Sequence, residues 1–382
     1  MGVISPHRIQ LSLFPIVVLL SLAWSASAAN SAHNTFVHCL VNHSEPSHPI
    51  TSAIFTPTNT SFSSVLQAYI RNLRFNTSTT RKPFLIITAL HVSHVQAAII
   101  CAQKHNLQMK IRSGGHDYEG VSYVAEVPFF ILDMFNLRSI EVDIDTETAW
   151  VQAGATLGEV YYRIAEKSKT HGFPAGVCPT VGVGGHISGG GYGNMMRKYG
   201  LSVDNVIDAQ MVDVQVEILL DRQPQSLNYL KRKSDYVKNP ITKESLEGIW
   251  KKMIELVDTI LYFNPYGGRM AEIPSTATPF PHRAGNLWKV EVADHYINLT
   301  RILHKYMTPF VSKNPREAFF NYKDLDLGIN HNGKNSYAEG RVYGVEYFKD
   351  NFNRLVQIKT KVDPDNFFRN EQSIPTLPNR KN

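Results

Sequence analysis

The sequence predicts an α+β fold whose two halves are organised differently. In the first half, apolar strand-like runs alternate with amphipathic helices and lead into glycine-rich turns, an order typical of an α/β unit. After Val214 the organisation changes to polar helical stretches interrupted by an alternating strand. The 382 residues leave room for roughly two domains, and 43% hydrophobic residues are enough to form a buried core.

The first predicted elements form a strand, helix, strand unit. Apolar residues at helical spacing predict helices over Ser61–Leu73 and Ser93–His105. The short apolar runs Lys82–Thr88 and Leu107–Arg112 predict strands. The second strand leads directly into the turn Ser113–Gly120. Because open α/β sheets bind ligands at the carboxyl ends of their strands, this turn is a candidate ligand loop.

The remaining predicted elements are spread along the rest of the chain. Strands are predicted over Phe129–Asp133, Ala149–Ala153, Val203–Val214 and Leu287–Val292. A helix over Thr156–Lys167 begins with a capping box, because Glu159 follows the threonine by three residues. Polar helix-rich or helical stretches are predicted over Ser226–Val257, Asn298–Val311 and Val345–Ile358. Pro265–Arg269 marks a turn, and Asp363–Asn366 breaks the last helix.

The N-terminus predicts a secretory signal peptide over residues 1–28. Leu11–Ala23 is apolar, and small residues suited to cleavage follow as far as Ala28. The apolar run is too short for a good membrane span, and no later segment offers one. We therefore expect a soluble, secreted mature chain that begins near Ala29. Four N-glycosylation sequons agree with this expectation: Asn42, Asn59, Asn76 and Asn298.

The net charge of +6 and the pI near 9.0 bear on partners. Secretion argues against nucleic acid, and the sequence has no run of lysine and arginine with interleaved aromatic residues. A weak affinity for acidic polysaccharide of the cell wall is the more sensible consequence of the charge.

The sequence has three cysteines, an odd number, so at least one thiol has no disulfide partner within the chain. Of three cysteines in an oxidising compartment, Cys39 and Cys101 are the natural disulfide pair, because both precede the glycine-rich stretch described next. Cys178 remains, and it lies inside that stretch.

The densest sequence signal is Gly176–Gly193, where eight of eighteen residues are glycine. Glycine at this density lets the backbone approach a flat or phosphorylated ligand closely. Neither of the two common phosphate-loop patterns, G-x-x-x-x-G-K-[ST] and G-x-G-x-x-G, is present. A nucleotide-type cofactor and an ordinary glycine-rich surface loop both fit this stretch by itself.

The motifs taken together resemble the berberine bridge enzyme-like (reticuline oxidase-like) proteins of plants. The resemblance rests on the signal peptide, the early cysteine pair, the motif Arg112–Gly120 and the loop around Cys178. These relatives are secreted flavoproteins of the vanillyl-alcohol oxidase type, and they include the cannabinoid synthases. Further motifs extend the resemblance over the mature chain: Tyr199–Asn205, Pro265–Arg269, Asn321–Asp326, Tyr347–Phe352 and Val362–Phe368.

The resemblance implies a domain arrangement. A PCMH-type FAD-binding domain is expected over residues 29–215. A truncated α+β substrate-binding domain of antiparallel sheet and helices is expected over residues 216–335, and a C-terminal segment over 336–382 is expected to return to the FAD domain. We expect a monomer that needs no metal.

The resemblance also implies FAD held by two covalent bonds. One runs from His116 to the flavin 8α-methyl carbon and the other from Cys178 to ring carbon 6, which would account for the leftover thiol. Imidazole and thiolate are the side-chain nucleophiles best suited to an electrophilic flavin; a purely structural His116 is the alternative. The other cofactor-binding candidates are Arg112, Ser113, Gly114, Gly115, Asp117, Val181, Gly182, Gly184, Gly185, His186, Ser188, Gly189 and Gly190. Of these, we expect His186 to be a hydrogen-bonded structural residue rather than a catalyst.

The implied reaction is hydride abstraction from an alcohol or amine carbon, favoured by the raised reduction potential of a doubly tethered flavin. The protein positions the substrate and removes a proton. By resemblance the catalytic candidates are Tyr322, Glu291, Tyr118 and Tyr199. Tyr322 occupies the position of a base in several relatives. Glu291 occupies that of a carboxylate or amide facing the flavin, with Lys289 on the same strand face; a solvated strand residue is its alternative.

Val181 bears on the oxidant. In the family, valine at this position resembles the oxidases and leucine the dehydrogenases, so we expect electrons to pass to O2 with release of H2O2. An ordinary packing valine is the alternative.

One departure from the family follows the strand ending at Met211–Gln215. Relatives continue with a second glycine-rich segment, whereas Val216–Arg222 here resembles a segment far downstream. A large internal block is therefore expected to be missing after about residue 215. Its loss would remove backbone donors to the flavin and leave unpaired strand edges and apolar faces, so we predict marginal stability or misfolding during secretion.

A second function class follows from that deletion. The chain would then be a non-catalytic secreted glycoprotein or a flavin-less relic of the family. For either class the expected location is extracellular, in the apoplast or cell wall, with the vacuole or endoplasmic reticulum as alternatives. The substrate of an active enzyme is not predicted, because alkaloids, phenolic alcohols, cannabinoid precursors and oligosaccharides are all oxidised within the group.

Overall fold

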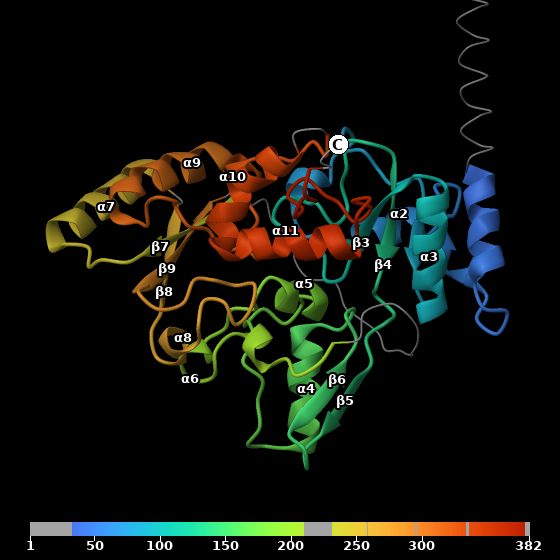
Figure 1. The fold of residues 1–382 in the computed structure, drawn as a ribbon, viewed down its shortest axis with the longest axis horizontal. Helices are drawn as coiled ribbons and strands as arrows, with labels where there is room; N and C mark the ends of the chain where they lie inside the picture. Colours follow the sequence, from blue (N-terminus) through green and yellow to red (C-terminus); the bar gives the residue numbers. More distant parts are fainter. Residues whose placement is uncertain (1–32, 210–230, 258, 295, 334–335, 379–382) are drawn as a thin grey trace, which may run out of the picture.

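The computed structural model describes residues 33–209, 231–257, 259–294, 296–333 and 336–378 (Figure 1). Within these ranges the strands form three sheets, of four, two and three strands. The helices that pack on them complete the α+β fold that the sequence predicts. The predicted signal peptide, residues 1–28, lies outside the described residues.

The four-stranded sheet is built around three parallel strands. These are β2 (Ile86–Thr88), β3 (Gln108–Arg112) and β4 (Phe129–Asp133), with β4 between the other two. The short β1 (Ile54–Phe55) pairs antiparallel with β2 at the edge. The helix α3 (Val92–Lys104) connects β2 to β3, which run parallel on either side of β4. The predicted strand, helix, strand unit is therefore present, and its glycine turn follows β3.

Both faces of this sheet are buried. One face contributes Phe130 to a hydrophobic cluster that includes α3 and a helix over residues 33–43. The other face contributes Ile131 to a cluster that includes α2 (Phe62–Gln67). Burial on both faces explains why β4 reads as a continuous apolar run, Phe129–Leu132, rather than an alternating one.

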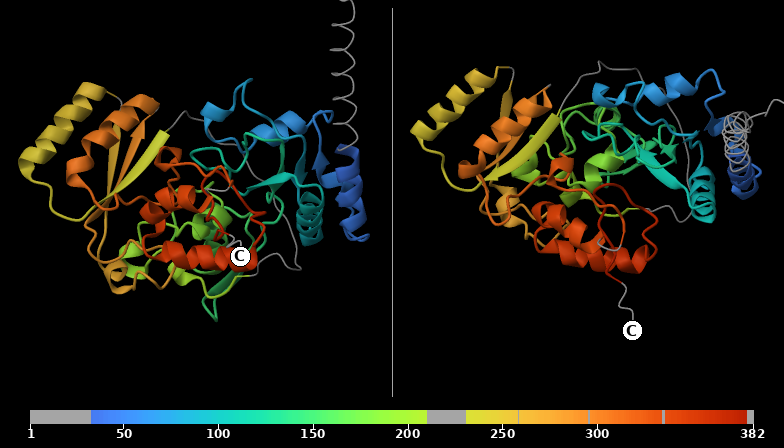
Figure 2. Two further views of the ribbon diagram at one scale, coloured as in Figure 1. Left: turned by 45° about the horizontal axis from the view of Figure 1, so that its top comes forward. Right: turned by 90° about the horizontal axis from the view of Figure 1, so that it is seen from above.

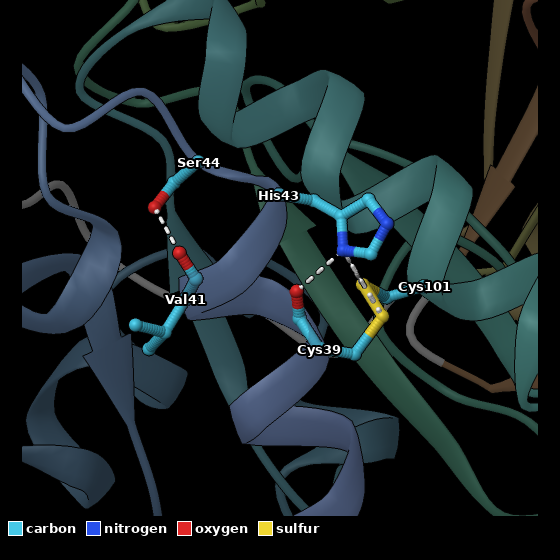
Figure 3. Close-up of a disulfide and its surroundings, with 5 residues drawn as sticks. All are labelled: Cys39, Val41, His43, Ser44 and Cys101. Carbon is cyan, nitrogen blue, oxygen red and sulfur yellow. Dashed lines mark hydrogen bonds between the residues drawn. A yellow bond between two sulfur atoms is a disulfide. The ribbon is translucent and has the colours of Figure 1, made fainter.

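The predicted disulfide between Cys39 and Cys101 is confirmed (Figure 3). It joins the helix over residues 33–43 to α3. His43 lies beside it, with Nδ1 2.8 Å from the carbonyl oxygen of Cys39. The cross-link therefore ties the start of the described chain to the covering layer of the first sheet.

A hairpin and a helix lead from this sheet to the glycine-rich stretch. The hairpin pairs β5 (Ile140–Asp143) with β6 (Thr148–Val151), and α4 (Leu157–Lys167) follows. The predicted capping box is confirmed: the side chains of Thr156 and Glu159 each accept a hydrogen bond from the other residue's backbone N–H. The glycine-rich stretch itself contains the short helix α5 (Val183–Ser188), and α6 (Met196–Tyr199) comes after it.

The three-stranded sheet is antiparallel, with β9 (Trp288–Asp294) between β7 (Lys231–Val237) and β8 (Ile260–Pro265). Two helices, α7 (Lys243–Leu256) and α9 (Ile297–Tyr306), lie over one face of it (Figure 2). The opposite face meets the glycine-rich stretch, where the Tyr192 hydroxyl donates a hydrogen bond of 2.8 Å to Asn264 of β8.

Along the long axis of the molecule, the C-terminal helices lie between the three-stranded sheet on the left and the four-stranded sheet on the right (Figure 1). These are α10 (Ser336–Phe348) and α11 (Asn351–Val362). Beyond them the chain reaches the first sheet, where Glu371 pairs with Lys110 of β3 at 3.0 Å.

Several predicted elements need correction. Residues 203–209 contain no strand but part of a 3₁₀ turn (Ser202–Asn205), and the rest of the predicted strand Val203–Val214 lies outside the described residues. The stretch predicted as polar and helix-rich, Ser226–Val257, includes the strand β7, in which Lys231, Lys233 and Asp235 are buried in ion pairs. The last predicted helix is two helices, interrupted at Lys349, whose φ is +49°. The strands β5 and β8 were not predicted.

Candidate functional site

Two glycine-containing loops meet at the end of β3. A side-chain Cβ at Gly114 would collide with the backbone of Gly182, and one at Gly182 would collide with Ser113. The Ser113 hydroxyl donates a hydrogen bond of 2.6 Å to the carbonyl of Ala153. The turn after β3 and the start of α5 therefore touch because both lack side chains at the contact.

The two candidate nucleophiles converge on one residue between these loops. His116 Nε2 lies 2.9 Å from the Thr180 hydroxyl, and Cys178 Sγ lies 3.7 Å from the same oxygen. Cys178 is partly exposed and belongs to no disulfide. Sequence analysis predicts the pair but not Thr180, which carries no motif signal of its own.

The residues around this contact fit a flavin. One imidazole and one thiol, each only partly buried, face a shared position. A Cβ at the exposed Gly185 would meet no atom within 4 Å, so the backbone there is open to a ligand. An open glycine backbone beside two nucleophilic side chains suits a flat cofactor that can be both cradled and attached.

The side chains of three other predicted cofactor residues, Arg112, Asp117 and Val181, make contacts inside the protein that stabilise the loops. The Arg112 guanidinium is fully buried, paired with Asp133 at 2.6 Å and bonded to two carbonyl oxygens of the α2 segment. The Asp117 carboxylate accepts hydrogen bonds from two backbone N–H groups of its own turn. Val181 packs partly buried in the cluster around α4. In the structure these side chains hold the loops in shape.

His186 is also internal. Its Nε2 accepts a hydrogen bond from the backbone N–H of Gly176 and lies 3.2 Å from the Ser202 hydroxyl. Burial lowers the pKa of His186 to about 4, so the ring is neutral near pH 7. Such a ring orders the glycine-rich stretch and carries no charge.

The second part of the site is the face of the three-stranded sheet that meets the glycine-rich stretch. Residues directly opposite in an antiparallel pair point to the same face. Glu291 of β9 lies opposite Ser234 of β7 and Tyr262 of β8, and Lys289 lies opposite Tyr236 and Asn264. Arg232 is two residues from Ser234 on β7, so its side chain belongs to this face too.

Three of the four predicted catalytic residues come together at this face. The rings of Tyr118 and Tyr322 lie 5.5 Å apart, and the Glu291 carboxylate lies near both tyrosines. Arg232 forms an ion pair with Glu291 and stacks over Tyr118, with 5.3 Å between its Cζ and the ring centroid. Burial, and then the charge of Glu291, raise the pKa of both tyrosines well above 10, so both hydroxyls keep their protons.

Tyr199 is the exception. It lies on α6, is 41% exposed, and its ring contacts the Lys198 ammonium instead. The structure leaves this predicted residue outside the cluster.

Lys289 is the centre of the face. It is fully buried, and its Nζ has no hydrogen-bond partner among the described residues. Three aromatic rings surround the ammonium: Tyr192 at 3.8 Å, Tyr322 at 4.0 Å and Phe319 at 4.7 Å, measured to the ring centroids. Burial lowers the pKa of Lys289 to about 7. Tyr192 was not predicted, although its place among four glycines is a usable signal.

Asn321 joins the two parts of the site. Its amide donates to the carbonyl of Gly185 at 3.0 Å and accepts from the N–H of Gly191 at 3.1 Å. Gly191 precedes Tyr192, and Asn321 precedes Tyr322. One amide side chain therefore links the two segments whose tyrosines contact Lys289.

A buried ion cluster lies on the opposite side of β7. Lys231 Nζ pairs with Glu119 and lies 2.9 Å from Asp324, and all three side chains are at most 4% exposed. Each member is one or two residues from a site residue, because Glu119 follows Tyr118, Lys231 precedes Arg232 and Asp324 follows Tyr322. The cluster thus fixes three distant segments of the chain at one point.

Comparison with known families gives two matches within the chain. Residues 83–219 match the FAD binding domain family, and residues 318–375 match the family described as "Berberine and berberine like". A relative, berberine bridge enzyme-like 8 of Arabidopsis thaliana, is 46% identical over 524 aligned positions, which cover 96% of this chain and 99% of the relative. Since the chain has 382 residues, the relative carries a long segment that has no counterpart here.

Solved structures agree in fold. A Bermuda grass isoallergen, BG60, superposes with a TM-score of 0.83 at 32% identity, covering 89% of this chain and 100% of that one. BBE-like #28 from Arabidopsis thaliana superposes with a TM-score of 0.82 at 31% identity, covering 90% and 99%.

Proposed function

Because the chain belongs to the berberine bridge enzyme-like family of FAD-linked oxidoreductases, we propose that it oxidises a small molecule with FAD joined covalently to His116 and Cys178. The observation that carries this proposal is the convergence of imidazole and thiol on Thr180. The open backbone at Gly185 supports it. When bound, FAD supplies a two-electron hydride acceptor that O2 can reoxidise to give H2O2.

The protein's own task is to take the substrate proton. The Tyr322 hydroxyl has a proton to give to the nearby Glu291 carboxylate and an oxygen lone pair to accept a proton from a substrate O–H. As hydride leaves the substrate carbon, the substrate proton passes to Tyr322 Oη and the tyrosine proton passes to the Glu291 carboxylate. This relay avoids a free phenolate, which burial disfavours. The Lys289 ammonium, 4.0 Å from the Tyr322 ring centroid, stabilises the partial negative charge that Tyr322 carries while the two protons move.

Val181 supports an oxidase rather than a dehydrogenase, and we propose O2 as the electron acceptor. The residue is a partly buried valine beside the Cys178 segment, with its N–H bonded to the Cys178 carbonyl at 3.3 Å. Its small side chain leaves more room than leucine would.

We also propose that the chain is secreted and glycosylated, with an FAD domain over residues 29–215, a substrate domain over 216–335 and a returning segment over 336–382. The disulfide supports an oxidising compartment. None of the helices in the described ranges is long and apolar enough to cross a membrane. The four sequon asparagines, Asn42, Asn59, Asn76 and Asn298, are exposed.

The test is the colour of acid-precipitated protein. The secreted chain, denatured with acid, is expected to retain its yellow colour in the precipitate, because a covalent bond survives unfolding. The double variant His116→Ala/Cys178→Ala is expected to lose that colour, whereas the control His171→Gln, at an exposed position, keeps it. Colourless wild-type protein would reject covalent flavin.

A second candidate is a non-catalytic secreted glycoprotein. The alignment with the Arabidopsis relative favours it, because that relative contains a long segment that this chain lacks. The same sample decides between the two: coloured protein that releases peroxide supports the oxidase, and folded colourless protein supports the glycoprotein.

A further inference from the structure

The side chains on the sheet face of the site range from exposed to fully buried. Exposure falls from 44% for Tyr262, through 27% for the Arg232 side chain and 5% for Glu291, to 0% for Lys289. A ligand that approaches from solvent therefore meets Tyr262 and Arg232 first. The reacting end of a substrate must lie deeper, beside Lys289 and the catalytic tyrosines.

The Arg232 guanidinium is held by neighbouring side chains, but one of its N–H groups has no acceptor among the described residues. Its Cζ lies 5.3 Å from the Tyr118 ring centroid and 5.9 Å from that of Tyr262, so two aromatic rings restrain the guanidinium plane. Nη1 donates to Glu291, while Nε is buried and has no hydrogen-bond partner within the described part of the chain. A buried N–H without an acceptor is unfavourable unless a ligand supplies one.

The charges of the face are also unbalanced. Arg232 and, in its protonated form, Lys289 share one carboxylate, that of Glu291, and this carboxylate is engaged by Arg232. The neighbouring tyrosines are uncharged because burial keeps their hydroxyls protonated. One further negative charge would balance the face, whereas the two charges of a phosphate would exceed the surplus and repel Glu291.

The backbone at Arg232 is fixed by contacts on the opposite face of β7. Lys231, the preceding residue, is anchored in the buried cluster with Glu119 and Asp324. The guanidinium therefore does not have to move to receive a ligand, and a rigid donor loses little freedom on binding.

We propose that Arg232 is a specificity-determining residue that binds a carboxylate on the substrate, and that the substrates are flat molecules carrying a carboxylate at the end remote from the oxidised carbon. A planar carboxylate matches the planar edge of the guanidinium. The flat part of the substrate can stack on the ring of Tyr262, which is exposed beside Arg232. The inference rests on the proposed function, since it assigns the substrate of the same site.

The test is calorimetric binding of acid and amide pairs to the secreted full-length protein. Benzoate, cinnamate and 4-hydroxycinnamate are each compared with the neutral primary amide of the same shape. At least one acid is expected to bind about tenfold more tightly than its amide, the effect of one charge-assisted hydrogen bond. Arg232→Gln should abolish the difference and Arg232→Lys should retain part of it. The control Arg269→Gln, whose side chain is 52% exposed in a surface ion pair, should leave it unchanged.

Equal binding of every acid and its amide, or a preference that survives in Arg232→Gln, overturns the proposal. The acid-precipitation colour of the same sample separates this outcome from failure of the proposed function. Coloured protein without a carboxylate preference overturns the substrate assignment alone. Colourless protein that keeps the preference supports the carboxylate site and overturns the flavin, and colourless protein without it overturns both.

Discussion

The Lys289 ammonium nitrogen lies 3.8 Å from the centroid of the Tyr192 ring and has no hydrogen-bond partner among the described residues. A fully buried cation held only by aromatic faces is costly to the fold, because ring quadrupoles replace little of its lost hydration. Burial lowers the pKa of Lys289 from its usual 10.5 to about 7. This unfavourable burial of Lys289 occurs beside Tyr322, where partial negative charge forms during the proposed proton relay.

The first prediction is a pH dependence of stability caused by Lys289. Between pH 7 and 10.5 the unfolded chain binds the proton more tightly than the folded chain, so the free energy of unfolding rises with pH across that window. Lys289→Met should therefore raise the free energy of unfolding by a few kcal/mol at pH 6, with a gain that shrinks toward pH 10. Urea denaturation at several pH values measures this. A gain independent of pH, or one also given by the exposed-site control Lys251→Met, would contradict it.

The second prediction concerns the relay. Tyr322→Phe removes the hydroxyl that would pass its proton to Glu291 and should lower kcat by roughly 10²- to 10⁴-fold, the usual value of a positioned acid–base group. The flavin colour should be unaffected. Tyr199→Phe is the matched control, because Tyr199 lies outside the cluster and is 41% exposed; its kcat should stay within about twofold. Peroxide release under single-substrate conditions reads out both. Equal kcat values for the two variants would refute the assignment.

The third prediction concerns the buried ion cluster. Lys231→Met removes the cation that Glu119 and Asp324 share. Glu119 keeps Arg74 and Asp324 keeps Lys233, so the free energy of unfolding should fall by about 3 kcal/mol, the lower end of the cost of breaking a buried pair. Lys243→Met breaks an exposed pair with Glu247, in which Lys243 is 83% exposed, and should change it by less than about 1 kcal/mol. Similar losses in the two variants would show that the cluster contributes no more than a surface pair.

The fourth prediction follows from an apolar stripe on α7. Trp250 and Ile254, four residues apart on one side of the helix, and Val257, just beyond its end, are 55%, 77% and 64% exposed. The strand β8 nearby pairs only with β9 among the described strands. An exposed stripe beside an open strand edge favours association between molecules, so Ile254→Lys should increase the monomer fraction on size-exclusion chromatography.

Ile249→Lys provides the contrast for that experiment. Ile249 is fully buried on the opposite side of α7, so a lysine there should abolish folding rather than improve solubility. A monomer fraction that Ile254→Lys leaves unchanged would contradict the prediction that the exposed stripe drives association.

The parts of the fold that the sequence predicts well carry local signals. The capping box of Thr156 and Glu159, the buried strand Phe129–Asp133 and the disulfide all follow from nearby residues or from the cysteine count. The strand β7 was missed because Lys231 and Lys233 suggest exposure, and their partner Asp324 is about ninety residues away in sequence. No local pattern reveals such a partner.

The same distinction applies to the site. His116 and Cys178 lie in recognisable motifs, whereas Thr180 matters only because it touches both of them. Tyr192 and Lys289 gain their meaning from a contact between segments almost a hundred residues apart. Tyr199 lies in a family motif, yet the helix α6 turns its ring toward Lys198 and solvent.

The most direct test of the central claim is peptide mapping of the secreted, deglycosylated protein by mass spectrometry. The account predicts one proteolytic fragment in which the peptide containing His116 and the peptide containing Cys178 are joined through a single flavin. In Cys178→Ala the flavin should remain on the His116 peptide alone. Recovery of both wild-type peptides separately at their unmodified masses would contradict the account.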